Sequence, residues 1–244
     1  MGNKRTVLVT GASRGIGREM ALAFAGAGFS VAANYSNSDE QALSLKAEIE
    51  KLGSNCGLYK CDVSGRAQVK NMAAALKKDF GALDVLVNNA AVCRDNAAAR
   101  MSENEWDEVI GTDLSGPFYI IKECSELMPP GGAVINIASI AGLRGNFGGA
   151  NYAAAKAGLI ELTKTAAAQL GEKGITVNAL LPGFHLTDMG KTMPEKYAAK
   201  ITEESVLKRT TDIKELGAFA VFVASLKSVS GQVFNVDSRL VRTW

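Results

Sequence analysis

The chain has 244 residues, of which 47% are hydrophobic, and its 27 basic and 25 acidic residues leave a formal net charge of only +2. This size and composition predict one domain over residues 1–244 with a full hydrophobic core. The charges are scattered, so we expect no nucleic-acid partner and no anionic membrane surface. We find no apolar stretch of membrane-spanning length and no secretion signal, because the first apolar run is short and enters a glycine turn.

The cysteines and the histidine give no metal-binding pattern. Cys56, Cys61, Cys93 and Cys124 form no C-x-x-C pair, and His185 is the only histidine. These spacings match no zinc site, so we expect no bound metal. Reduced thiols are typical of cytoplasmic proteins, and we expect that location.

Short apolar runs alternate with helical patterns along the chain. We expect seven strands, at residues 7–10, 30–34, 56–61, 83–88, 133–138, 176–181 and 232–236. The runs are almost wholly apolar, which predicts strands covered on both faces, and helical connections between them imply a parallel sheet. Ser102 followed by Glu105 predicts a capping box on the helix that carries Trp106. The expected fold class is α/β, a doubly wound parallel sheet with helices on both faces.

A glycine-rich turn follows the first expected strand. Residues 10–17 have the sequence T-G-A-S-R-G-I-G and open a helix that we expect to end near Ala27. Glycines there let backbone N–H groups and the helix N-terminus approach a pyrophosphate. The candidate cofactor-binding residues are Gly11, Ser13, Arg14, Gly15, Ile16 and Gly17. The spacing differs from the commoner G-x-G-x-x-G, and a tight turn without a ligand is the alternative.

The end of the second expected strand bears on which dinucleotide binds. Residues 33–36 contain no carboxylate to hold the ribose of NAD(H), whereas Arg14 would attract the additional phosphate of NADP(H). We therefore expect NADP(H), with Ser36 near that phosphate; the alternative for Arg14 is a solvated loop residue. Further candidates at the carboxyl ends of the third and fourth strands are Asp62, Val63, Asn89 and Ala90.

Tyr152 and Lys156 form a candidate acid/base pair. They lie four residues apart in an alanine-rich helix, so both project from one face, and an ammonium near a phenol lowers the pKa of the phenol. Ser139 closes the fifth expected strand 13 residues earlier, where its hydroxyl converges on the same substrate oxygen. A Y-x-x-x-K pair is a weak signal alone, and its position after the fifth strand carries the argument.

Together these motifs resemble the short-chain dehydrogenase/reductase family, over essentially the whole chain. The shared features are T-G-x-x-x-G-x-G, N-N-A at 88–90, Ser139, Tyr152, Lys156, and Pro182-Gly183 followed by Thr187. The stretches at 94–96, 151–158 and 182–184 are most similar to the 3-oxoacyl-[acyl-carrier-protein] reductases of fatty-acid synthesis. The resemblance implies a Rossmann-like fold and a homotetramer or dimer, formed through the helices that carry Asp113 and Tyr152.

The resemblance also implies roles for individual residues. Tyr152 would donate or take the proton, Lys156 would hold the cofactor ribose and lower the pKa of Tyr152, and Ser139 would position the carbonyl. Asn89 would contact the cofactor from beneath. The nicotinamide end would be held around Pro182, Gly183, His185 and Thr187, by a backbone group, so that the imidazole of His185 need not take part.

Three places depart from the family pattern. Asp113 occupies the fourth catalytic position, usually Asn, where a main-chain carbonyl holds a water linked to the lysine. Pro117 has no N–H to give to the Asp113 carbonyl, so we hypothesise that Asp113 preserves this proton relay with an altered pH profile. Ala91 replaces a frequent Gly, and Ser238-Arg239 replaces the usual Gly-Gly, with an effect on a subunit contact or the cleft mouth.

The resemblance implies NADPH-dependent reduction of a 3-oxoacyl thioester to a 3-hydroxyacyl thioester. Acyl carrier protein docks on basic residues near the cleft of relatives, whereas Lys122 here is flanked by Glu123 and Glu126. Substitutes would be Lys164, Lys173, Lys191 and Lys196, and coenzyme A is the alternative carrier.

Two other functions stay open. One is reduction of another small alcohol or ketone, which residues 186–207 would decide. The other is a weakly active partner subunit of a hetero-oligomeric reductase. Residues 189–207 themselves predict either a mobile substrate lid or an ordinary helical insertion.

Overall fold

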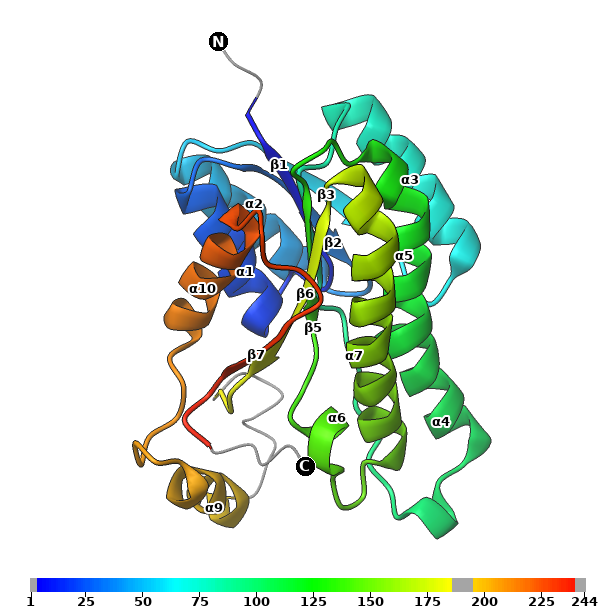
Figure 1. Cartoon of the computed structure of the whole chain (residues 1–244), viewed down its shortest axis with the longest axis vertical. Helices are drawn as coiled ribbons and strands as arrows, with labels where there is room; N and C mark the ends of the chain where they lie inside the picture. The colour runs from blue at the N-terminus through cyan, green and yellow to red at the C-terminus, as the bar shows by residue number, and fades with distance from the viewer. Residues whose placement is uncertain (1–3, 186–194, 240–244) are drawn as a thin grey trace.

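The computed structural model of the protein describes residues 4–185 and 195–239, in which seven parallel strands form one sheet of order β3-β2-β1-β4-β5-β6-β7 (Figure 1). The strands are β1 Thr6–Val9, β2 Ser30–Tyr35, β3 Cys56–Lys60, β4 Val85–Asn88, β5 Ala133–Ile137, β6 Thr176–Pro182 and β7 Val233–Val236. The predicted doubly wound α/β sheet is confirmed, with strand ends displaced by a residue or two. The strand order reverses next to β1, which places the carboxyl ends of β1 and β4 beside a ligand-binding crevice.

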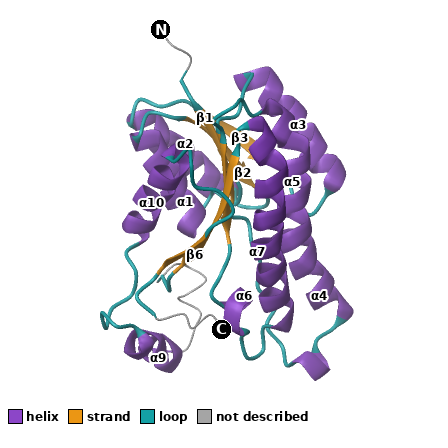
Figure 2. Ribbon diagram, viewed as in Figure 1, coloured by secondary structure: helices purple, strands orange, loops and turns teal. Residues whose placement is uncertain are grey.

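Helices cover both faces of the sheet (Figure 2). One face carries α1 Gly15–Gly26, α2 Asp39–Lys51 and α10 Ile213–Ser225, and the other carries α3 Arg66–Phe80, α4 Glu103–Ile110, α5 Gly116–Cys124 and α7 Ala150–Leu170. Two further helices, α6 Ala141–Arg144 and α9 Glu195–Glu204, lie near the carboxyl ends of the strands. Among the described residues, no helix is long and apolar enough to cross a membrane.

Alternate residues of the strands pack into separate apolar layers. Val7 and Val9 of β1 belong to the layer beneath α1 and α10, whereas Leu8 belongs to the layer beneath α3 and α5. All three are fully buried. Burial of each such side chain stabilises the fold by about 1.5–3 kcal/mol, which explains the unbroken apolar runs.

The helix after β4 contains a widened turn. The capping box predicted at Ser102 is present: its hydroxyl accepts from the Glu105 N–H at 3.2 Å, and its own N–H donates to the Glu105 carboxylate at 2.7 Å. The α4 helix then ends at Ile110, and a π-helical turn over Gly111–Ser115 joins it to α5. Such turns insert an extra residue into a helix and are frequent at functional sites.

Candidate active site

The glycine turn has the backbone shape that a pyrophosphate requires. Gly11 and Gly15 adopt φ values of +61° and +57°, which other residues rarely adopt. A Cβ atom at Gly17 would lie only 2.3 Å from the Gly11 carbonyl oxygen. No side chain caps the N-terminus of α1 within the described residues, so its first N–H groups remain available to an anion. This cradle fits a dinucleotide.

Neutral side chains hold the turn against its neighbours. The Thr10 hydroxyl accepts from the N–H groups of Asn89 and Ala90 at 2.9 and 3.0 Å, and the Asn89 amide donates to the Thr10 carbonyl at 2.9 Å. Asn34 accepts from the Gly11 N–H at 3.3 Å and donates to the Cys61 carbonyl at 2.9 Å. Asn89 was predicted to contact the cofactor, and its amide nitrogen supports the turn itself. The sequence analysis gave Asn34 no role.

The residues proposed for dinucleotide selection are exposed beside the turn. Arg14 is the N-cap residue of α1, and its side chain has no ion pair with the described residues. Ser36 is also exposed. The acidic residue nearest to Ser36 along the chain is Asp39. Its carboxylate accepts hydrogen bonds from the Lys60 ammonium at 2.7 Å and from the Tyr35 hydroxyl at 3.0 Å. That carboxylate is therefore already partnered.

The candidates at the end of β3 have structural contacts. The Asp62 carboxylate accepts from the backbone N–H and the hydroxyl of Ser64, at 2.9 and 2.7 Å. Val63 is buried, and a Cβ atom at Gly116 would lie 3.0 Å from its side chain. This end of β3 thus packs against the start of α5, next to the π-helical turn.

Ser139, Tyr152 and Lys156 meet at the carboxyl end of β5. Ser139 follows β5, and its hydroxyl accepts from the Ala141 N–H at 3.2 Å. Lys156 is buried, donates to the Ile137 carbonyl at 3.0 Å, and places its ammonium 5.4 Å from the centre of the Tyr152 ring. The arrangement puts a phenol, a hydroxyl and an ammonium around one point, which suits proton transfer to a carbonyl oxygen.

Asp113 joins this cluster through its side chain. Its carboxylate is fully buried, with Oδ2 at 3.2 Å from the Lys156 ammonium and Oδ1 accepting from the Val92 N–H at 2.8 Å. Pro117, which has no N–H to donate, lies in the first turn of α5. An altered charge of the site was predicted for Asp113, but its direct ion pair with Lys156 was not.

Burial and charge act on these groups in opposite directions. Burial raises the pKa of the Tyr152 phenol above its ordinary value, and the Lys156 ammonium and the Ser139 side chain lower it only in part. Burial also raises the pKa of Asp113 against the effect of Lys156. Burial lowers the pKa of Lys156 and is the largest single effect, but the acidic groups of Asp113, Tyr152 and Cys93 together outweigh it, and the net shift is upward. The expected fall in the tyrosine pKa is therefore reversed by desolvation.

The segment after β6 supports the cleft through backbone packing. A Cβ atom at Gly183 would lie 1.8 Å from the Thr211 hydroxyl, so only glycine fits there. The buried His185 imidazole is 3.0 Å from the Thr211 carbonyl through Nδ1, and burial lowers its pKa. Pro182 ends β6, and Thr187 lies outside the described residues. His185 thus has a structural contact that explains its presence.

Asn151 is a buried residue whose role the sequence analysis missed. Its amide donates to the Arg94 carbonyl at 3.0 Å and to the Glu105 carbonyl at 2.9 Å, while its oxygen accepts from the Tyr152 N–H at 2.8 Å. It therefore ties the start of α7 to α4 and to the loop after β4. An asparagine near the start of a predicted helix is the sequence feature that could have indicated this role.

The unusual C-terminal pair contacts the segment after α9. The Ser238 carbonyl accepts from the Val206 N–H at 3.1 Å, and its hydroxyl contacts that of Ser205. Arg239 is buried and paired with Asp237. These contacts join the C-terminal segment to the end of α9. The segment 189–207, predicted as either a mobile lid or a helical insertion, is helical over α9, and its residues 189–194, including Lys191, lie outside the described residues.

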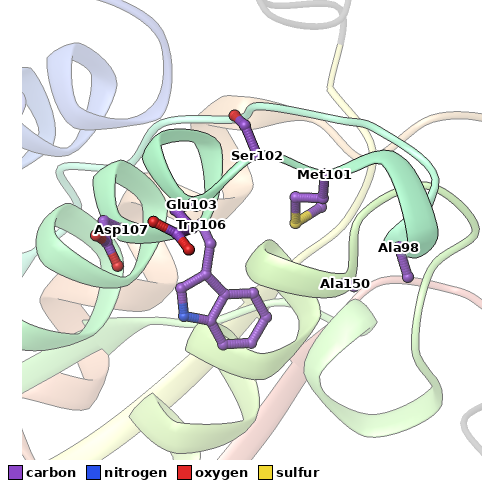
Figure 3. Close-up of a pocket in the computed structure, with 7 residues that line it drawn as sticks. All are labelled: Ala98, Met101, Ser102, Glu103, Trp106, Asp107 and Ala150. Atoms are coloured by element: carbon purple, nitrogen blue, oxygen red, sulfur yellow. The ribbon is translucent and has the colours of Figure 1, made fainter.

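The proposed carrier-docking lysines have acidic partners. Lys164 pairs with Glu161 at 2.6 Å, and Lys173 pairs with Glu126 at 2.5 Å. The Lys196 side chain is outside the described part of the structure. A separate cavity of about 380 Å³ lies between α4 and the start of α7, lined by Met101, Trp106 and Ala150 among others (Figure 3). Neither feature includes the Tyr152 cluster.

Comparisons with known proteins show the family of the chain. A family model described as enoyl-(acyl carrier protein) reductase matches residues 11–238. The chain is 42% identical over 237 residues to a 3-oxoacyl-[acyl-carrier-protein] reductase of Staphylococcus epidermidis, covering 96% of this chain and 97% of that protein. It is 40% identical over 242 residues to a 3-oxoacyl-[acyl-carrier-protein] reductase of Synechocystis sp., covering 97% of each.

A solved structure extends the similarity to the whole fold. A short-chain dehydrogenase of Burkholderia cenocepacia in complex with NADP has a TM-score of 0.91 and 30% identity, and 97% of each chain is covered. The fold and the site thus define an oxidoreductase with a Rossmann-like sheet. The chain belongs to the short-chain dehydrogenase/reductase family, as its motifs predicted. Within that family it is similar to the 3-oxoacyl-[acyl-carrier-protein] reductases.

Proposed function

We propose that this protein catalyses NADPH-dependent reduction of a 3-oxoacyl thioester to a 3-hydroxyacyl thioester. The observation that carries the proposal is the convergence of Ser139, Tyr152 and Lys156 at the same carboxyl edge of the sheet as the glycine cradle, in a chain 42% identical to a 3-oxoacyl-[acyl-carrier-protein] reductase. A bound nicotinamide supplies the hydride that adds to the carbonyl carbon. The Tyr152 phenol gives its proton to the carbonyl oxygen, which becomes the hydroxyl of the product.

The other residues bind and orient. The Ser139 hydroxyl stabilises the developing negative charge on the same oxygen. The Lys156 ammonium holds a ribose hydroxyl and favours the phenolate left on Tyr152 after proton transfer. The first N–H groups of α1 hold the pyrophosphate, and Arg14 with Ser36 selects NADP(H). The segment from Pro182 to Thr187 holds the nicotinamide end, with Asp62, Val63, Asn89 and Ala90 around the rest of the dinucleotide.

The test is turnover by purified protein with acetoacetyl thioesters of coenzyme A and of acyl carrier protein, with NADPH and NADH in parallel. The nicotinamide absorbance is expected to fall with NADPH, faster for the carrier that the enzyme uses, and Tyr152→Phe is expected to remove the activity. Absence of turnover with both carriers and both cofactors, despite measurable NADPH binding, would refute the proposal and direct attention to other carbonyl substrates or a partner subunit.

We further propose a homo-oligomer built through the helices that carry Asp113 and Tyr152. Trp106 on α4 and Phe118 on α5 are 41% and 47% exposed, which supports an apolar contact on this side. Light scattering is expected to give a dimer or tetramer, and a smaller particle for Phe118→Glu. A monomeric wild type would refute this contact.

A further inference from the structure

The carboxylate of Asp113 is fixed on both sides. Its Oδ1 accepts the Val92 N–H at 2.8 Å, from the loop after β4, and its Oδ2 lies 3.2 Å from the Lys156 ammonium on α7. The two side chains are 0% and 3% exposed, so water does not screen the pair. The π-helical turn over Gly111–Ser115 is the element that carries the carboxylate to this position.

The ammonium of Lys156 is correspondingly constrained. One of its three protons goes to the Ile137 carbonyl at 3.0 Å, and the Asp113 Oδ2 atom lies 3.2 Å from the same nitrogen as an ion-pair contact. This leaves a donor for the side occupied by Tyr152, whose ring centre lies 5.4 Å away, or for a ribose hydroxyl. The lysine is therefore oriented before any cofactor binds.

Two opposite charges consequently act on the Tyr152 phenol. The Lys156 ammonium favours the phenolate, and the Asp113 carboxylate favours the protonated phenol. The other titratable group that acts on the phenol is the Cys93 thiol: burial raises its pKa to about 11, and once ionised it also favours the protonated phenol. Arg94 and Asp95, in the same loop, are exposed and act on Cys93. At a pH where the Cys93 thiol is protonated, Asp113 is the acidic side chain that opposes Lys156 at the phenol among the described residues.

We propose that Asp113 is a positioning residue that holds Lys156 by a direct ion pair and, by offsetting its charge, keeps Tyr152 in the protonated form that carbonyl reduction consumes. This inference rests on the proposed function, because it assigns Tyr152 as the proton donor. A neutral asparagine at this position leaves the ammonium unopposed, so the phenol ionises at lower pH. The resting enzyme is therefore set for reduction over a wider alkaline range than the Asp113→Asn variant would be.

The test is a titration of phenolate absorbance in the unliganded protein. The chain has five tyrosines, and subtracting the matched Tyr152→Phe titration in each background isolates Tyr152. Asp113→Asn is expected to lower the midpoint of Tyr152 by about one pH unit or more, a tenfold change in proton affinity. Asp107→Asn, which removes an exposed carboxylate of α4, is expected to leave it unchanged. An unchanged or raised midpoint in Asp113→Asn overturns the proposal.

A second variant and a kinetic readout keep the test decisive. Asp113→Ser removes the same charge with a smaller side chain, and it replaces Asp113→Asn if circular dichroism shows that the latter is unfolded. In the pH–rate profile of thioester reduction, the alkaline limb is expected to move to lower pH by the same amount as the midpoint. If the wild type reduces no thioester, the proposed function fails while the titration still decides the role of Asp113.

Discussion

The two halves of the carboxyl edge of the sheet, the glycine turn and the Tyr152 cluster, place polar and charged side chains in opposite ways. Around the glycine turn, the neutral side chains of Thr10, Asn34 and Asn89 bond to backbone groups, and the charged Arg14 is exposed. Around Tyr152, by contrast, the charges of Asp113 and Lys156 are both buried and face each other. The structure of the glycine turn therefore depends on close packing, and that of the Tyr152 cluster depends on the balance of two buried charges.

This difference predicts which substitutions destabilise each of the two regions. A neutral hydrogen-bonded cradle is insensitive to pH but intolerant of added volume, because its backbone segments are in contact. A buried ion pair accepts changes in volume poorly too, but its main weakness is the loss of one partner, which leaves an uncompensated charge. Four variants test this contrast, in order of decreasing expected effect.

Tyr152→Phe is expected to lower kcat for reduction by about 10²–10⁴-fold, because it removes the proton donor. Steady-state kinetics measure the loss, and NADPH binding should persist, since the glycine cradle is untouched. Tyr59→Phe is the matched control: its hydroxyl bonds Asp79 between β3 and α3, away from the site. A near-normal kcat in Tyr152→Phe would show that Tyr152 is not the proton donor.

Lys156→Met is expected to lower the free energy of unfolding by about 3–5 kcal/mol, because Asp113 is left buried and unpaired. Urea unfolding measures this loss. The double variant Asp113→Asn/Lys156→Met should lose less than the sum of the two single variants, which is the signature of a coupled pair. Lys164→Met, which breaks an exposed pair with Glu161, should cost about 0–1 kcal/mol. Strict additivity would mean that the buried pair contributes nothing.

Gly17→Ala is expected to destabilise the protein by about 1–3 kcal/mol and to weaken dinucleotide binding, since its Cβ atom would lie 2.3 Å from the Gly11 carbonyl oxygen. Gly26→Ala, in the same helix, meets no atom within 4 Å and should be neutral or stabilising by up to about 1 kcal/mol. Thermal unfolding and NADPH titration of both variants measure the difference. Equal behaviour of the two would contradict a close-packed cradle.

Arg14→Ala is expected to weaken NADPH binding by roughly tenfold and to leave NADH binding unchanged, because one charge-assisted contact to the additional phosphate is lost. Fluorescence titration with each dinucleotide measures the ratio. Arg18→Ala, whose side chain pairs with Glu48 on α2, is the matched control and should leave the ratio intact. An equal loss for both dinucleotides would assign Arg14 to the shared pyrophosphate instead.

Local patterns predicted the sheet and the cap, but not the contacts across the fold. The central strands could be predicted because both faces are buried, which makes the runs apolar. Ser102 could be placed because capping depends on near neighbours. The Asp113–Lys156 pair joins residues far apart in sequence through a π-helical turn, for which no local pattern was available. The pKa of Tyr152 was expected to fall, since spacing shows the nearby ammonium but not the burial that outweighs it.

The central claim is that Tyr152 protonates a 3-oxoacyl thioester while NADPH delivers hydride. The most direct measurement supplies acetoacetyl-coenzyme A and NADPH deuterated at the transferred position, and identifies the product by mass spectrometry. The expected product is a 3-hydroxybutyryl thioester that carries deuterium at C3, formed by the wild type and not by Tyr152→Phe. An unlabelled product, or equal amounts of labelled product from both proteins, would contradict it.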